Sequence, residues 1–195
     1  RAGECLLLKQ DYAGAIKTLQ PFRDHAPLQN VKEVSDRALL RLGHAFGHAA
    51  QWDASRQTLE VLVGRFGTSP WVDEARYGIG WAWQNQNQFD NAVNAYLQVI
   101  QRTAAEIAAK SQLQIGLCRL QQKRHAEAAS ALLVVPFTYD YPEWSALALC
   151  EASRVFVELK QPDQAGKLLQ RVMKDHPTSK WADVAKQRLA EIKVP

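Results

Sequence analysis

Two histidines stand four residues apart and could place their imidazole groups on one face of a helix. His44 and His48 have a spacing that can bind a metal ion such as zinc. No glutamate follows His44, as the HExxH motif requires, and no third ligand is suggested nearby. Arg37 and Arg41 are expected on the same face, where they would repel a cation. The pattern therefore predicts a solvated polar face and no metal site.

Other motifs of enzyme active sites are missing from the sequence. It has no GxxxxGK[ST] phosphate loop, no GxSxG nucleophile elbow and no GxGxxG after a predicted strand. The glycines of the string GIGWAW, residues 78–83, fall inside a predicted helix, where they serve close packing. The 20 acidic residues are spread over predicted solvent faces, so no acid–base pair stands out. We predict that the protein is not an enzyme and uses no cofactor.

Composition and charge narrow the class of protein. With 47% hydrophobic and 23% charged residues, the chain has the composition of a folded globular protein. The 24 Lys and Arg residues against 20 Asp and Glu residues give a net charge of +4, without any long basic run. The charge therefore points to no particular partner. The richest apolar patch, residues 131–137, is broken by Pro136 and is too short to span a membrane.

The cysteines indicate neither a disulfide framework nor a zinc site. Cys5, Cys118 and Cys150 are odd in number and show no CxxC spacing. We expect all three to be buried thiols.

The strongest pattern is an internal repeat with a period of 36 to 40 residues. A bulky apolar residue recurs beside the start of a predicted helix, at Val34, Trp71, Ile107, Trp144 and Trp181. Each block also holds two small residues twelve positions apart, namely Gly3 and Ala15, Gly43 and Ser55, Gly80 and Ala92, Gly116 and Ala128, Ser153 and Ala165. The repeated spacing predicts that every block has the same local structure.

That structure is predicted to be a helical hairpin. Small side chains on both helices let the backbones approach to about 8–10 Å, and the large apolar side chains beside them fill the grooves. Apolar residues recur at helical spacing, as in Leu39, Leu42 and Phe46. Short polar turns separate the two helices of each block, and no strand pattern of useful length appears.

The predicted fold is all-α, a right-handed α-solenoid of about five helical hairpins with a C-terminal capping helix. We predict a single domain over residues 1–195, with repeats at 1–33, 34–70, 71–106, 107–143 and 144–180 and the cap at 181–195. Ser69 before Pro70 and Asp140 before Pro142 are predicted N-caps, and residues 24–27 and 175–179 are predicted loops. The sequence opens without Met in an apolar run that is typical of mid-helix, so we expect a fragment of a longer protein.

The order of residues in each block resembles the tetratricopeptide repeat, W-x2-L-G-x2-Y…A-x3-F…P. One block carries Leu39, Leu42-Gly43, Phe46, Ser55 and Leu59. The long period resembles that of a bacterial envelope subgroup of these proteins, as do the strings that join the blocks, such as TSPWVDEA and PTSKWADVA. That subgroup includes the Tol-Pal accessory protein and the tetratricopeptide lipoprotein of the outer-membrane β-barrel assembly machinery. The resemblance implies a periplasmic or envelope location.

The resemblance also implies a concave groove lined by the exposed side of the first helices, which binds a peptide or partner domain. The predicted lining residues include Arg37, Arg41, His44, His48, Tyr77, Trp81, Gln84, Asn85, Lys110, Gln114 and Arg154. Co-chaperone members hold a C-terminal carboxylate with a Lys and an Asn one helical turn apart. Leu40 and His44 stand at the matching places here, so we expect no such clamp.

Two groups of aromatic residues have alternative interpretations. Trp81 with Tyr77 is a candidate hot spot for a partner. Alternatively, Trp81 and Trp83 fill the space between hairpins, and we favour this interpretation. Pro136 is predicted to end its helix early. The aromatic string at residues 136–144 then either docks a partner or, as we favour, folds back over the gap.

Three functions are compatible with these patterns. The leading prediction is a protein–protein interaction scaffold within a bacterial envelope assembly. The second is an architectural spacer or oligomerisation arm, with self-association and an empty groove. The third, which is less favoured, is RNA binding by a helical-repeat module that reads one base per repeat.

Overall fold

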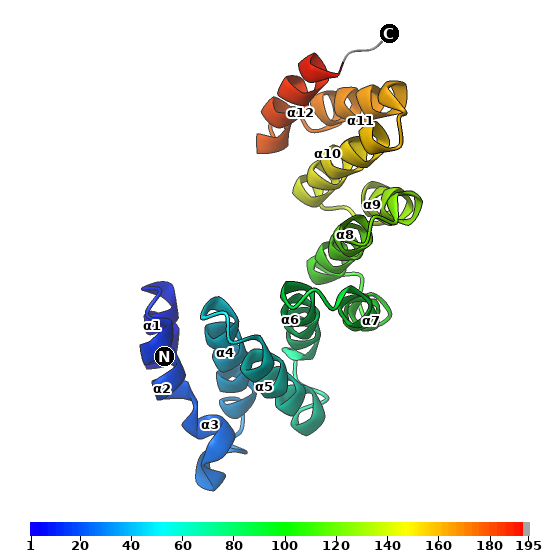
Figure 1. Cartoon of the computed structure of the whole chain (residues 1–195). Helices are drawn as coiled ribbons and strands as arrows, with labels where there is room; N and C mark the ends of the chain where they lie inside the picture. Colours follow the sequence, from blue (N-terminus) through cyan, green and yellow to red (C-terminus); the bar gives the residue numbers. More distant parts are fainter. Residues whose placement is uncertain (193–195) are drawn as a thin grey trace. The chain divides into compact units, whose positions relative to one another are not determined.

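The structure is a computed structural model, which describes residues 1–192. Residues 193–195 of the predicted cap lie outside the described residues. The chain forms two compact units, one from residue 1 to 102 and one from residue 103 onward. Both consist of helices packed in sequence order, so the predicted all-α repeat solenoid is confirmed (Figure 1). A single domain over the whole chain stays a prediction.

The first unit contains three helical hairpins. The first hairpin pairs α1 with α2, the second pairs α4 with α5, and the third pairs α6 with α7. Helix α2 packs on α4, and α5 packs on α6, so the second helix of one hairpin supports the first helix of the next. The elements are α1 (Ala2–Leu8), α2 (Tyr12–Leu19), α3 (Pro21–Asp24), the 3-10 helix η1 (Ala26–Leu28), α4 (Ser35–His48), α5 (Trp52–Arg65), α6 (Val72–Asn85) and α7 (Phe89–Ile100).

The second unit contains two hairpins and a closing helix. Helix α8 (Glu106–Gln121) pairs with α9 (His125–Thr138), and α10 (Pro142–Glu158) pairs with α11 (Pro162–Asp175). Helix α12 (Lys180–Glu191) packs on α11 and α10. Its buried Ala185 joins Leu149, Leu169 and Val172 in one apolar cluster. The predicted closing helix therefore covers the apolar face that the last hairpin leaves open.

The small residues mark the contact between the two helices of each hairpin, as predicted. Gly43 and Ser55 are buried, and the Ser55 hydroxyl donates a 2.8 Å hydrogen bond to the Gly43 carbonyl. The glycines also receive a large side chain from sixteen positions later. A Cβ atom on Gly80 would lie 2.6 Å from Cε1 of Tyr96, and Gly3, Gly43 and Gly116 face Leu19, Leu59 and Leu132 in the same way.

The turns inside the hairpins share one backbone conformation. The residue seven positions after each small residue of the first helix has a φ of 56° to 61°, at Gln10, Ala50, Asn87, Lys123 and Lys160. The next amide bonds to the carbonyl five residues back, as in the 2.9 Å bond from Gln51 N to the Phe46 carbonyl. This pattern is the Schellman motif, which ends a helix with a left-handed residue. None of these positions is glycine.

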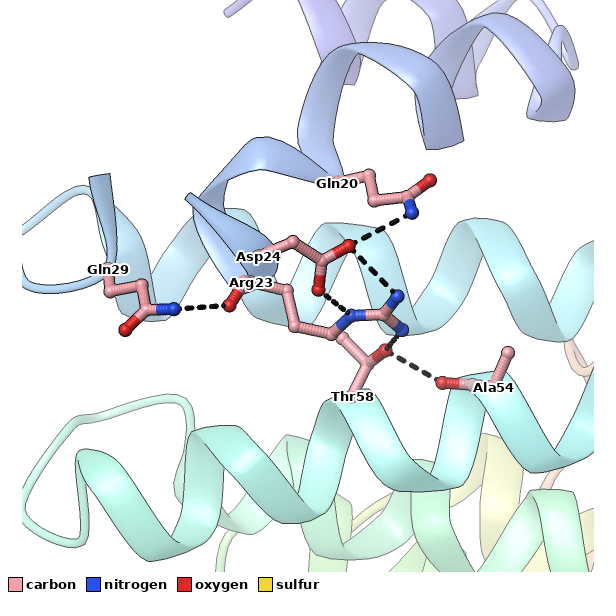
Figure 2. Close-up of polar contacts among 6 residues, drawn as sticks. All are labelled: Gln20, Arg23, Asp24, Gln29, Ala54 and Thr58. Atoms are coloured by element: carbon pink, nitrogen blue, oxygen red, sulfur yellow. Dashed lines mark hydrogen bonds and ion pairs between the residues drawn. The ribbon is translucent and has the colours of Figure 1, made fainter. Parts of the chain in front are cut away.

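The first hairpin departs from the others at Pro21. Pro21 has no amide hydrogen, and α2 ends before it while α3 begins on it. The Arg23 guanidinium links α3 to α5 by donating a 3.1 Å hydrogen bond to the Thr58 hydroxyl, and it also pairs with Asp24 within α3 (Figure 2). Residues 24–27 are therefore no plain loop, because Asp24 ends α3 and η1 starts at Ala26.

Three further predictions about local structure are corrected. Pro136 does not end α9 early, because it lies in the last turn, where the loss of one amide leaves the helix intact to Thr138. The aromatic string has no gap to cover: Tyr139 is buried, whereas Phe137 is exposed beneath Arg171. Asp140 is no N-cap, because Tyr141 precedes Pro142 in an extended conformation and takes that position.

The remaining N-cap prediction is wrong, and the cysteine predictions are confirmed in part. Helix α6 begins at Val72 with Trp71 at the N-cap position, so Ser69 lies in the turn before the helix, where its hydroxyl accepts a 3.2 Å hydrogen bond from Trp71 N. Cys118 and Cys150 are buried as predicted. Cys5 is exposed, because it lies on the same face of α1 as the exposed Leu8 and away from the buried Gly3.

Candidate partner-binding site

Four of the predicted lining residues meet in one hollow of the first unit. Arg37, Arg41, His44 and His48 follow one another at intervals of about one turn along α4, so their side chains share a face. The hollow has a volume of about 480 Å³. Its other lining residues are Glu4, Leu7 and Leu8 on α1 and Tyr12 on α2. The site therefore combines charged, aromatic and aliphatic side chains.

The two arginines converge on a single carboxylate. Glu4 Oε1 lies 2.7 Å from one terminal nitrogen of Arg37, 2.8 Å from its Nε and 3.3 Å from Nε of Arg41. Burial acts to raise the pKa of Glu4, but the hydrogen bonds and charges of the arginines outweigh it and lower the pKa. Glu4 is therefore ionised at neutral pH, and it sits between the two guanidinium groups.

His44 lines the same hollow and is uncharged at neutral pH. Burial lowers its pKa to about 4, and the positive charges of Arg41 and His48 act in the same direction. The Nε2 atom lies 3.8 Å from Oε1 of Glu74 on α6, and that same oxygen lies 3.9 Å from Arg41. The imidazole thus contributes polarity without charge.

A row of aromatic side chains borders the hollow. Tyr12 stacks on His48 with ring centres 5.2 Å apart, and His48 lies 5.9 Å from Trp81. Trp52 meets Trp81 edge-on at 5.1 Å. Because Trp81 also lies over Gly47, it fills space between hairpins and remains half-exposed at the same time. The packing interpretation of this ring is therefore supported, and its role as a hot spot for a partner stays a prediction.

Besides Leu7 and Leu8, sequence reasoning missed three members of this site. Tyr12 and Trp52 occupy the same place in successive repeats, two residues after the left-handed turn residue, which is the signal that could have identified them. Glu4 lies on α1, and no pattern in its local sequence indicates the contact with α4.

The other predicted residues of α6 contact their own hairpin. Tyr77 packs on the Tyr96 ring at 5.5 Å, and the amide oxygen of Gln84 accepts a 2.7 Å hydrogen bond from the Tyr96 hydroxyl. Asn85 is exposed and donates to the Trp81 carbonyl. Trp83 stacks under the Arg56 guanidinium of α5 at 4.3 Å, in agreement with the packing role favoured for it.

The remaining predicted residues belong to the second unit. Lys110 pairs with Glu106 at 3.0 Å and lies over the Trp144 ring, and Gln114 is half-buried on α8. Arg154 pairs with Glu151 at 3.0 Å and lines a separate hollow of about 490 Å³ with Arg188 and Val157. None of these three residues lines the hollow on α4.

The described residues contain neither a group of metal ligands nor a helix that could span a membrane. No group of three or more His, Cys, Asp or Glu side chains within residues 1–192 is placed to hold a metal ion. In the same part of the chain, no helix has the length and apolar character to cross a bilayer.

Comparisons with known proteins agree with the hairpin architecture. A family model described as a tetratricopeptide repeat matches residues 77–137, and another with the same description matches residues 148–179. A search of the curated proteins finds no match.

Several solved structures share the fold. MamA is 18% identical with a TM-score of 0.70, and the alignment covers 98% of each chain. The apo form of RapI is 11% identical with a TM-score of 0.83, over 98% of this chain and 57% of RapI. The Rap conjugation gene regulator of plasmid pLS20, in complex with the Phr* peptide, is 14% identical with a TM-score of 0.65, over 100% of this chain and 57% of that chain. These identities show the fold alone, and they single out no envelope protein.

Proposed function

We propose that this chain, a tetratricopeptide repeat protein, is a scaffold that binds a peptide or partner domain on the exposed face of its first helices. Tetratricopeptide repeats generally mediate protein–protein interaction. The observation that carries the proposal is the hollow on α4, where four predicted lining residues gather beside Leu7 and Leu8. The hollow is open and lies on the face where the sequence pattern predicts a partner.

The chemistry of the hollow suits a peptide. Arginine, tyrosine and tryptophan carry most of the binding energy at protein interfaces, and Arg41, Tyr12 and Trp81 supply all three types here. Leu8 is exposed and offers an apolar contact. The Rap regulator, which has the same fold at 14% identity, is solved with a bound peptide, which supports the capacity of such a fold to hold one.

Selection from a displayed random peptide library tests the proposal. Selected peptides are titrated calorimetrically against the protein and against Arg41→Ala and Trp81→Ala variants. We expect each variant to lose about tenfold in affinity, which corresponds to about 1.4 kcal/mol. Lys17→Ala is the control, because Lys17 is exposed on α2 outside this hollow. A library that yields no peptide, or peptides that ignore both substitutions, would contradict the proposal.

The narrower roles are tested separately. An architectural or oligomerisation role predicts a concentration-dependent dimer in sedimentation and no selected peptide. RNA binding predicts affinity for a single-stranded oligonucleotide that falls steeply with added salt. A role in a bacterial envelope assembly rests on the sequence resemblance, and fractionation of the source cells tests it.

A further inference from the structure

We infer that the arginine pair of the α4 hollow receives an acidic side chain from the middle of a partner peptide, and that Glu4 occupies this position until the partner binds. The inference rests on the proposed function and names the chemistry of the ligand. It also assigns Glu4 a role as an internal competitor that sets the affinity for acidic partners.

The contacts of Glu4 resemble those of a bound ligand. One oxygen, Oε1, takes all the contacts from the arginines, at 2.7 and 2.8 Å to Arg37 and 3.3 Å to Arg41. The carboxylate comes from α1, whereas both arginines project from α4. A guanidinium group presents its donors in a fork that fits any carboxylate, so a carboxylate of a partner can take the place of Glu4 on the same donors.

The ion pairs with Glu4 are weak enough to be exchanged. The side chain of Arg37 is 51% exposed, that of Arg41 is 28% exposed and that of Glu4 is 24% exposed. Ion pairs that remain in contact with water contribute little to stability. A peptide carboxylate that binds in the fork of an arginine therefore replaces them at small cost.

Charge complementarity favours an acidic occupant. The hollow is lined by two arginines and one glutamate, and His44 adds no charge at neutral pH because its pKa lies near 4. Glu74 approaches Arg41 only to 3.9 Å and is not among the residues that line the hollow. The lining therefore keeps a positive excess for a ligand.

Apolar walls on both sides of Glu4 indicate the neighbours of the acidic residue. Leu7, Leu8 and Tyr12 line the hollow on one side. A second hollow of about 200 Å³ also has Glu4, Arg37 and Arg41 in its lining. Its apolar lining residues are Leu19, Phe22, Val34 and Ala38, and Arg1 and Glu33 complete it with opposite charges. The matching peptide places bulky apolar residues on either side of its acidic residues.

Two matched peptides provide the probe. The acidic peptide is acetyl-Leu-Glu-Asp-Phe-Glu-Leu-amide with a fluorescent label, and its neutral partner replaces the three acids by their amides. The blocked ends remove terminal charges, so that only side-chain carboxylates are tested. Binding is measured by fluorescence polarisation at low and at physiological salt.

We expect the wild-type protein to bind the acidic peptide at least tenfold more tightly than the neutral one, and the difference to shrink as salt screens the charges. Glu4→Gln should tighten binding of the acidic peptide about three- to tenfold, whereas Arg37→Gln and Arg41→Gln should weaken it by a similar factor. Glu60→Gln is the control, since Glu60 is also paired with an arginine, Arg56, but lies on α5 outside both hollows. It should leave the affinity unchanged.

Equal affinity of Glu4→Gln and wild-type protein for the acidic peptide would overturn the inference, as would equal binding of the two peptides or no binding of either. The resonances of the arginine Nε groups provide a second readout that needs no substitution. Those of Arg37 and Arg41 should shift when the acidic peptide is added to the wild-type protein, and constant resonances would also overturn the inference. If library peptides bind the hollow while acidic ones do not, the inference fails and the proposed function stands.

Discussion

At the scale of single residues, the closest approach between two helices of a hairpin depends on the absence of a side chain. At Gly80, a Cβ atom would lie 2.6 to 2.9 Å from three carbons of the Tyr96 ring. The ring cannot move aside freely, because its hydroxyl is bonded to Gln84. At Gly64, on the exposed side of α5, nothing lies within 4 Å of the same position.

Gly80→Ala should therefore destabilise the protein by about 1–3 kcal/mol through overpacking. Gly64→Ala should stabilise it by about 0.5–1 kcal/mol, because alanine restricts the unfolded chain and favours the helix. Urea unfolding of both variants measures the difference. Equal effects of the two substitutions would show that the helices do not meet at Gly80.

The uncharged state of His44 makes stability depend on pH. Its pKa is about 4 in the folded protein and 6.5 in the unfolded chain, so the unfolded state binds a proton first as the pH falls. The stabilisation is fully present above pH 6.5 and is lost as the pH falls towards 4. Each unit of pKa corresponds to about 1.4 kcal/mol, and because the side chain is 27% exposed we expect a total of about 1–3 kcal/mol.

The prediction is measured as the difference between wild-type protein and His44→Gln in the free energy of unfolding at pH 7.5, 6, 5 and 4. The difference removes the contribution of carboxylates that titrate in the same range. As the pH decreases, the free energy of unfolding should fall by more in the wild-type protein than in the variant. A constant difference would show that His44 is protonated normally in the fold.

At the scale of elements, each hairpin turn contains a residue whose left-handed backbone conformation is unfavourable. A non-glycine residue in the left-handed region costs about 1–2 kcal/mol, and asparagine tolerates that region better than other residues. Ala50→Gly should therefore stabilise the protein by about 0.5–1 kcal/mol, while Asn87→Gly, at the same place one repeat later, should change stability less. Thermal unfolding of the two variants tests this order, and a loss of stability in Ala50→Gly would contradict it.

The sequence predicts the regular helical hairpins better than the places where a proline changes a helix. The twelve-residue spacing of small residues identifies each hairpin, because both helices need small side chains at their point of contact for the axes to approach. The two prolines show the limit of local rules: Pro21 breaks a helix, whereas Pro136 is accommodated within one. The difference depends on where the helix ends, which packing decides.

The candidate site shows the same limit. Spacing along one helix predicts Arg37 and His44 on a shared face, because 3.6 residues complete a turn. Glu4, Tyr12 and Trp81 reach this face from three other helices, and only the packing of hairpins brings them there. A single helix can be analysed from its own residues, whereas a site shared between helices cannot.

At the scale of the whole molecule, stability is expected to be local, since in repeat proteins each hairpin contacts only its neighbours. Leu169 on α11 is fully buried among residues of α10 and α12, and Leu59 on α5 is fully buried among residues of α4 and α6. Leu169→Ala should cost about 2–5 kcal/mol and should lower the protection of α10, α11 and α12 from hydrogen exchange before that of α4. Leu59→Ala should give the reverse order. Exchange followed by mass spectrometry resolves these segments, and a uniform loss of protection in both variants would show that the chain unfolds as one cooperative body instead of as neighbouring hairpins.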